Sequence, residues 1–178
     1  LSDGRTVTAT PTTASGYTTT FSSWSPASGK ITAKTNVIAN FTRTVNTYKV
    51  TYNYSENGGT SATKTSANVN YNADIDLTVS ASKSGYTFVG WNTNKDALVG
   101  LTSLKMGTSD VTLYAIYSKT VTATCNYYNG QTTKVTGTMY NKNTSVSVTL
   151  PTIANQTVSN VTYTQRGWAT SDAANATI

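Results

Sequence analysis

A short aromatic segment recurs three times along the chain, and this recurrence constrains the fold more than any other feature. The middle copy, residues 85–91, reads GYTFVGW, and related segments occupy residues 16–24 and 161–168. The likeness continues past the tryptophan, because residues 92–94 and 169–171 are also similar. Self-similarity at a spacing on the order of 70 residues indicates small repeated units rather than one large domain.

The segments between the aromatic copies also correspond, and they do so in the same order. Residues 111–117 form an apolar segment that ends on an aromatic residue, as residues 36–41 do. Residues 48–54 run into an Asn-Gly turn, and residues 121–128 do the same. Because Asn-Gly tolerates the positive φ values of tight hairpin turns, each repeat is predicted to run strand, turn, strand, loop, strand, longer connection, strand.

These correspondences predict three repeats of unequal completeness. A partial first repeat at residues 1–46 lacks its opening strand, the middle repeat at residues 47–118 is complete, and a partial third repeat at residues 119–178 lacks its closing strand. An incomplete sheet leaves backbone groups unpaired, and proteins normally cover such edges. Two explanations stay open: excision from a longer array, or head-to-tail strand addition between copies.

Alternation at a period of two predicts a mainly β protein. The cleanest run extends from Val69 to Leu77, where apolar residues alternate with Asn and Asp, and its counterpart is predicted from Met139 to Leu150. Thr, Tyr and Val also suit a pleated, half-buried surface. One short helix is expected between Lys95 and Met106, where the apolar residues are spaced more like a helical turn.

The composition argues against several classes of protein. The net charge is +6, but the 13 Lys and Arg residues are scattered, so no clustered nucleic-acid footprint is present. No apolar run approaches the roughly 20 residues that span a bilayer, and membrane insertion of this segment is not expected. Cys125 is the single cysteine and the chain has no His, which removes a disulfide framework, a cysteine-based zinc site and a Cys–His nucleophile.

Three tryptophans stand at equivalent places, and two interpretations fit them. Trp24, Trp91 and Trp168 would form a sugar-stacking ladder if they were exposed. A repeated Trp in a small unit more often fills the core, and this interpretation is favoured. The twelve tyrosines are the better source of a binding surface, because strand alternation places some of them outside.

Asp74 and Asp76 are the candidates for acid–base or metal chemistry. They would act as a general acid and base, or bind calcium together with Asn70 and Asn72. A helix-flanked calcium loop would need a glycine where Ile75 stands, and two acids on one strand face are usually solvated. No catalytic, cofactor-binding or metal-binding residue is therefore predicted, and no cofactor is expected.

A lysine–asparagine isopeptide crosslink is a further option for a threonine-rich surface module. It would need a buried lysine beside an asparagine and an acid. Lys49 and Lys119 stand at equivalent strand starts and are the two candidates.

The segments together resemble the Listeria-Bacteroides repeat family, also called the internalin-type B-repeat. Its pattern of a Val-Thr-aromatic strand before Asn-Gly-Gly, a Gly-Tyr-Thr-Phe-x-Gly-Trp segment and a strand ending Leu-Tyr-Ala-x-aromatic is found at residues 50–59, 85–91 and 113–117. Tyr117 replaces the family's usual final Trp, and Ser23 replaces the glycine before the first tryptophan. The resemblance implies small β-grasp-like repeats with mixed sheets and at most one short helix per repeat, arranged as an elongated tandem array. It supplies no catalytic residue.

The expected function is that of a non-catalytic tandem-repeat segment of a secreted bacterial cell-surface protein, acting as a stalk, spacer or adhesion module. The alternatives are a filament subunit that polymerises head-to-tail by strand complementation, and a glycan-binding module. The expected partners are neighbouring repeats or copies of the same chain, with a host protein or a glycan as further classes. An enzyme is not expected, because a general base and an activated nucleophile are both scarce.

Overall fold

The computed structural model describes residues 7–29, 33–65, 68–127 and 130–169. Within them the chain is mainly β-structure with almost no helix, and its sheets are open, as the alternation predicts. The chain divides into two compact units, Leu1–Tyr117 and Ser118–Ile178. The described residues include no helix long and apolar enough to cross a membrane.

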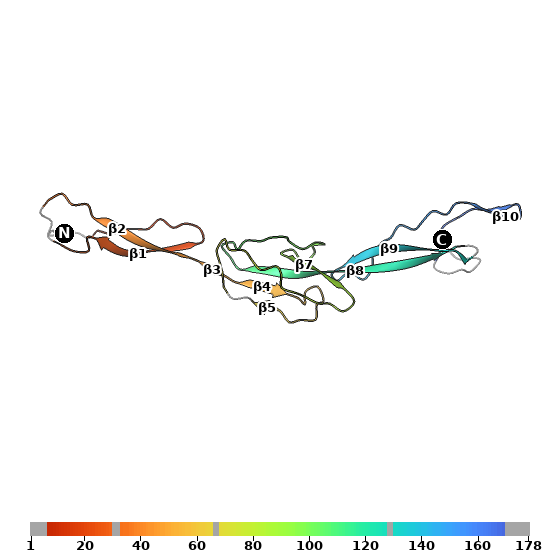
Figure 1. Ribbon diagram of the computed structural model, residues 1–178, viewed down its shortest axis with the longest axis horizontal. Helices are drawn as coiled ribbons and strands as arrows, with labels where there is room; N and C mark the ends of the chain where they lie inside the picture. The colour runs from red at the N-terminus through yellow and green to blue at the C-terminus, as the bar shows by residue number, and fades with distance from the viewer. Residues whose placement is uncertain (1–6, 30–32, 66–67, 128–129, 170–178) are drawn as a thin grey trace. The chain divides into compact units, whose positions relative to one another are not determined.

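The first unit begins with a two-stranded antiparallel hairpin (Figure 1). Strand β1 (Tyr17–Ser25) pairs with β2 (Ile38–Val45), and Phe21 lies opposite Phe41. The register skips Ser22, so a bulge takes up part of the extra length of this aromatic segment.

A mixed sheet forms the centre of the first unit (Figure 1). Its strand order is β5-β4-β8-β7, in which β4 (Val50–Asn53) is antiparallel to β5 (Lys64–Thr65) and parallel to the first residues of β8 (Val111–Asn126). Strand β7 (Thr87–Asn92) lies at the other edge and carries the middle aromatic segment. The mixed sheet expected for the middle repeat is thus present.

A short pair of strands precedes this sheet. Strand β3 (Thr47–Tyr48) pairs antiparallel with β6 (Val69–Asn70). Asn72 then adopts a left-handed φ of 63° in a turn. The run predicted as one strand from Val69 to Leu77 is therefore regular at its start only. Its side chains nevertheless alternate between inside and outside, and Ile75 is buried.

The segment from Lys95 to Met106 contains no helix, so the expected short helix is wrong. Its backbone bonds run to other segments instead of along a helix: Leu101 N–H donates to the Trp91 carbonyl at 2.7 Å, and Met106 N–H donates to that of Ala73 at 2.9 Å. The apolar side chains spaced like a helical turn are turned inward by these contacts. Leu101 is half-buried and Met106 is fully buried.

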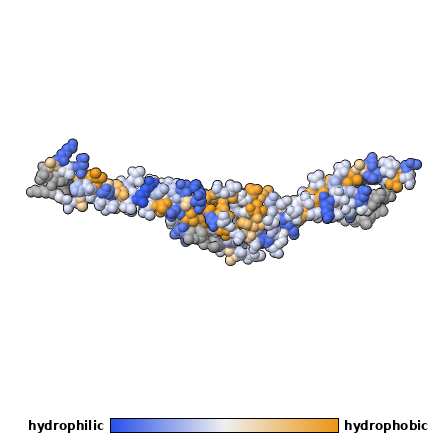
Figure 2. Space-filling model, in the orientation of Figure 1, coloured by the Kyte–Doolittle hydropathy of each residue, from blue (hydrophilic) through white to orange (hydrophobic). Residues whose placement is uncertain are grey.

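The core of the first unit lies in the middle repeat, between the sheet and the segments that cross it. Apolar side chains also reach the surface, both over this repeat and on the β1–β2 hairpin (Figure 2). The buried hydrophobic residues in contact with one another are Val50, Tyr52, Tyr54, Ile75, Trp91, Met106, Leu113, Ala115 and Tyr117.

The second unit is built on a long hairpin. The later residues of β8, from Ser118 to Asn126, pair antiparallel with β9 (Thr132–Tyr140). Two short strands follow, β10 (Gln156–Val158) and β11 (Val161–Tyr163).

The strand predicted from Met139 to Leu150 is regular only up to Tyr140. Asn141 follows with a left-handed φ of 52°, as Asn72 does in the middle repeat. The chain then packs back over β9, because a Cβ at Gly137 would lie 2.8 Å from the side chains of Val146 and Val148.

Candidate functional site

Trp91 is the centre of an aromatic cluster in the middle repeat. Its side chain is fully buried, and its ring meets those of Tyr52 and Tyr54 edge-on, each at a centroid distance of 5.0 Å. Phe88, three residues earlier on β7, packs on it at 5.6 Å. The indole N–H donates to the Val79 carbonyl at 2.6 Å, which satisfies the one polar group that the ring carries. Trp91 is therefore a core residue and offers no face to a sugar.

The aromatic segment at residues 16–24 has contacts like those of one half of this cluster. Phe21 packs on Trp24 at 5.4 Å and on Phe41 at 6.0 Å. These contacts correspond to those that Phe88 makes with Trp91 and with Tyr117.

The aromatic segment at residues 161–168 has contacts like those of the other half. Tyr127 packs on Trp168 at 5.7 Å, as Tyr54 does on Trp91. The Trp168 indole N–H donates to the Pro151 carbonyl at 2.9 Å. Trp24 and Trp168 are half-buried, so all three tryptophans make structural contacts.

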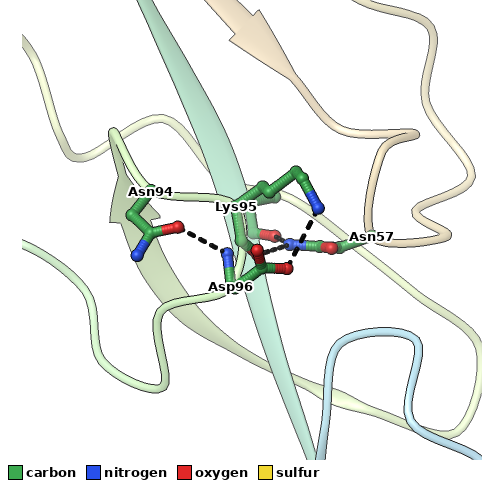
Figure 3. Close-up of polar contacts among 5 residues, drawn as sticks. Asn57, Asn94, Lys95 and Asp96 are labelled. Atoms are coloured by element: carbon green, nitrogen blue, oxygen red, sulfur yellow. Dashed lines mark hydrogen bonds and ion pairs between the residues drawn. The ribbon is translucent and has the colours of Figure 1, made fainter.

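Asn57, in the turn after β4, joins three segments through its carboxamide (Figure 3). Its Nδ2 donates at 2.9 Å to the Lys95 carbonyl and at 2.9 Å to the Ala115 carbonyl on β8. The side chain is buried, with 3% of its surface exposed. A buried amide whose two N–H groups are both used holds its neighbours in one geometry.

The turn itself fixes the position of Asn57. Gly58 has a φ of +79°, and its N–H donates to the Ser55 carbonyl at 2.8 Å. Gly59 cannot carry a side chain, because a Cβ there would lie 2.2 Å from the Tyr117 hydroxyl. The Asn-Gly-Gly sequence thus supplies the amide, the left-handed backbone and the close approach together.

The phenols of Tyr52 and Tyr117 lie in the core, and burial raises the pKa of both above the ordinary value for tyrosine. For Tyr52, the charge of Asp76 raises the pKa further. The Tyr52 hydroxyl donates to the Asp76 carbonyl at 2.6 Å. Both phenols stay neutral in the fold at physiological pH, and neither is placed as a proton acceptor.

Asp74 and Asp76 are not brought together as a pair. Asp74 lies 2.8 Å from the Lys105 ammonium in an exposed ion pair. Asp76 accepts from the N–H and the hydroxyl of Thr78, at 2.8 and 2.6 Å. Asn70 and Asn72 are exposed, and the described residues contain no group of three or more acidic, His or Cys side chains that could hold a metal.

The two lysines considered for a crosslink are both exposed, which does not meet the requirement for burial. Lys49 instead uses its backbone, since its N–H donates to the Asp110 carboxylate at 2.8 Å. Cys125 is a free cysteine buried on β8, at the place that Tyr52 occupies in the middle repeat.

The loop after β7 is ordered by its own polar side chains. Asn92 accepts from the Asn94 N–H at 2.9 Å, and Asn94 accepts from that of Asp96 at 3.0 Å (Figure 3). Lys95 pairs with Asp96 at 3.1 Å, and this hydrogen bond raises the lysine pKa. Both side chains are exposed, so the loop is a solvated connection that presents the Lys95 carbonyl to Asn57.

A comparison with protein-family models assigns the part of the chain that contains this cluster. Residues 48–116 match the Listeria-Bacteroides repeat domain. The Listeria-Bacteroides repeat thus includes β4, the Asn57 turn, β7 with Trp91, and β8 as far as Ile116. The resemblance drawn from the three motifs is confirmed over this range. Neither the curated proteins nor the solved structures gave a match.

The match is consistent with a bacterial surface repeat protein, and a repeat-domain family points to a non-enzymatic role. The division into three repeats at residues 1–46, 47–118 and 119–178 stays a prediction, as do the partners.

Sequence reasoning missed the role of Asn57, which it treated only as part of a turn. The available signal was the doubled glycine: one Asn-Gly pair is enough for a hairpin turn, whereas Gly59 has to admit the Tyr117 hydroxyl. The second glycine therefore indicated that this turn packs against the core.

Proposed function

We propose that the chain is a non-catalytic repeat segment of a secreted bacterial cell-surface protein and that it acts as a stalk or spacer. Arrangement of its β-grasp-like repeats as an elongated tandem array is part of this proposal. The observation that carries it is that the motif side chains point into the core. Trp91 and Asn57 of the matched repeat are both buried, and both donate hydrogen bonds to backbone carbonyls. A site for chemistry would turn such groups toward a substrate.

The proposal is tested by displaying the chain on a bacterial surface between a wall anchor and a fluorescent reporter. The height of the reporter above the wall is measured for one, two and three copies of the chain in series. A spacer raises the reporter with each added copy. A height that stays the same with copy number contradicts the proposal.

A second candidate function is supported by the exposed apolar face of the β1–β2 hairpin (Figure 2). Phe21 and Phe41, which lie opposite each other on one face of this hairpin, are 42% and 39% exposed. In the middle repeat Phe88, which corresponds to Phe21, is half-buried, and Tyr117, which corresponds to Phe41, is fully buried. A strand from another copy that paired with the edge of β2 would extend this sheet, place its own side chains beside Phe41 and give a head-to-tail filament.

Sedimentation of the purified chain over a range of concentrations tests this candidate. A filament former gives species that grow with concentration, and Phe41→Ser removes them. A chain that stays monomeric contradicts the filament. Retention on a glycan array that survives Phe41→Ser would instead favour the glycan-binding alternative.

A further inference from the structure

The path of the chain through the middle repeat determines how that repeat responds to a pulling force. The chain enters the central sheet at β4 and leaves it along β8, and these two strands are parallel neighbours. Val50 pairs with Val111 at one end of the contact, and Asn53 pairs with Tyr114 at the other. In chain order, the first and last strands of the central sheet are therefore bonded directly to each other.

Tension applied through the chain loads this pair in shear. Tension from residue 46 pulls β4 toward its amino end, and tension from residue 118 pulls β8 toward its carboxyl end. Because the strands are parallel, the two pulls are opposed along one axis. The load is then shared by all hydrogen bonds across the pair, which have to break together.

Both ends of the pair are reinforced. At the start, Lys49 N–H donates to the Asp110 carboxylate at 2.8 Å, and Val111 N–H donates to the Lys49 carbonyl at 2.9 Å. Beyond the other end, the Asn57 carboxamide reaches from the β4 turn to the Ala115 carbonyl on β8.

One face of the pair is also buried. Val50 and Leu113 have no exposed surface, and the Asn57 bond to Ala115 is buried. Burial on this face limits the access of water to these hydrogen bonds while they are under load.

The two hairpins of the chain have the opposite geometry. In β1–β2 the chain enters at Tyr17 and leaves at Val45, and these residues are paired side by side. In the β8–β9 hairpin the paired end residues are Ser118 and Tyr140. Tension on such neighbours peels the strands apart one bond at a time, so each hairpin opens at low force.

We propose that the parallel β4–β8 pair is a force-bearing clamp, which keeps the middle repeat folded under a tension that opens both hairpins. This rests on the proposed spacer function, because a spacer under pull needs an element that keeps its length. The clamp gives the chain a graded response: the hairpins extend first and absorb length, and the matched repeat holds.

Single-molecule force spectroscopy of the whole chain tests the clamp. With handles at the two termini, the last step is the opening of the middle repeat, and it lengthens the chain by on the order of 230 Å for the residues between Val50 and Tyr117. In the second geometry the handles are attached through Thr47→Cys and Ser109→Cys, which precede the first residues of β4 and β8. Cys125→Ala is present in both forms so that the handles are unique.

The two geometries pull on the same fold in different directions. Attachment at positions 47 and 109 peels the parallel strands apart, and we expect a several-fold lower opening force than with terminal handles at the same loading rate. Forced opening follows the unfolding barrier, so urea midpoints, measured for both forms, serve as the control for unchanged stability. Equal forces in the two geometries would overturn the clamp. That result would leave the reporter-height test of the spacer untouched, and a flat reporter height would leave the force difference intact.

Discussion

At the scale of single residues, the buried carboxamide of Asn57 donates two hydrogen bonds that connect separate segments of the first unit. Asn57→Ala leaves the carbonyls of Lys95 and Ala115 without their donor. Removing one partner of a buried hydrogen bond exposes the other to the full desolvation penalty, so a loss of about 2–4 kcal/mol in unfolding free energy is expected. Urea denaturation measures it.

The matched control is Asn94→Ala. The Asn94 carboxamide also bonds to the backbone, where its oxygen accepts from the Asp96 N–H, but it does so in an exposed loop. A change within about 1 kcal/mol is expected there. Equal losses for the two variants would mean that burial of the Asn57 amide contributes nothing.

The core phenols make the first unit sensitive to alkali. Burial raises the pKa of Tyr52 and of Tyr117 above the ordinary tyrosine value of 10.0, so the unfolded chain releases these protons at a lower pH than the fold does. Their contribution to stability is fully present below pH 10.0 and is lost as pH rises through the folded pKa values. Urea midpoints measured from about pH 9 to about pH 11 are expected to fall.

Tyr52→Phe keeps the aromatic ring and removes the hydroxyl that titrates, so it distinguishes the two contributions. It removes the bond to the Asp76 carbonyl, which costs about 1 kcal/mol at neutral pH, and it makes the alkaline fall shallower. Tyr163→Phe, at a side chain that is 45% exposed, should change neither quantity. An alkaline fall of unchanged slope in the Tyr52 variant would place the sensitivity elsewhere.

At the scale of elements, the crossing of β7 by the segment that follows it depends on two glycines. Gly90 has a φ of +146°, and a Cβ at Gly100 would lie 2.8 Å from the Gly90 Cα. Gly100→Ala forces these backbones apart and disturbs the Leu101–Trp91 bond. A loss of about 1–3 kcal/mol in unfolding free energy is expected by thermal denaturation.

Gly107 provides the control for this crossing. A Cβ added there meets nothing within 4 Å, and Gly107→Ala should leave the melting temperature nearly unchanged. If Gly100→Ala were equally harmless, the crossing would have to be looser than the 2.8 Å contact indicates.

The sequence predicted an element well where its structure depends on residues within the same segment, and poorly where it depends on a distant partner. The recurring aromatic segment predicted the centre of the core, because a buried Trp in a small unit has few alternatives. The alternation after Val69 predicted which side chains point inward. It did not predict that pairing with β3 ends at Asn70 and that residues 72–75 bond to residues 104–106 instead, because this partner segment lies some thirty residues away.

The expected helix between Lys95 and Met106 failed for the same reason. A helical spacing of apolar residues also arises where an irregular segment dips repeatedly into a core. Here Leu101 and Met106 are held by backbone bonds to distant residues, which a pattern within twelve residues does not contain.

At the scale of the whole molecule, the two units differ in how much they bury. The matched repeat contributes a fully buried Trp, Met, Leu and Val to the first unit, whereas the residues described after 117 include only Cys125 and Asn141 in the buried class. Stability follows buried apolar area, so the second unit should open at a lower free energy than the first.

Hydrogen exchange in increasing urea tests this difference and the independence of the two units. Amides of β9 are expected to exchange through an opening of lower free energy than those of β4 and residues 111–117. Trp91→Ala, which costs about 3–5 kcal/mol, should then erase much of the protection in β4 while leaving that in β9 unchanged. The matched substitution Trp168→Ala should do the reverse. If Trp91→Ala removed the protection of β9 as well, the units would unfold as one body, and stability would no longer be a sum over units.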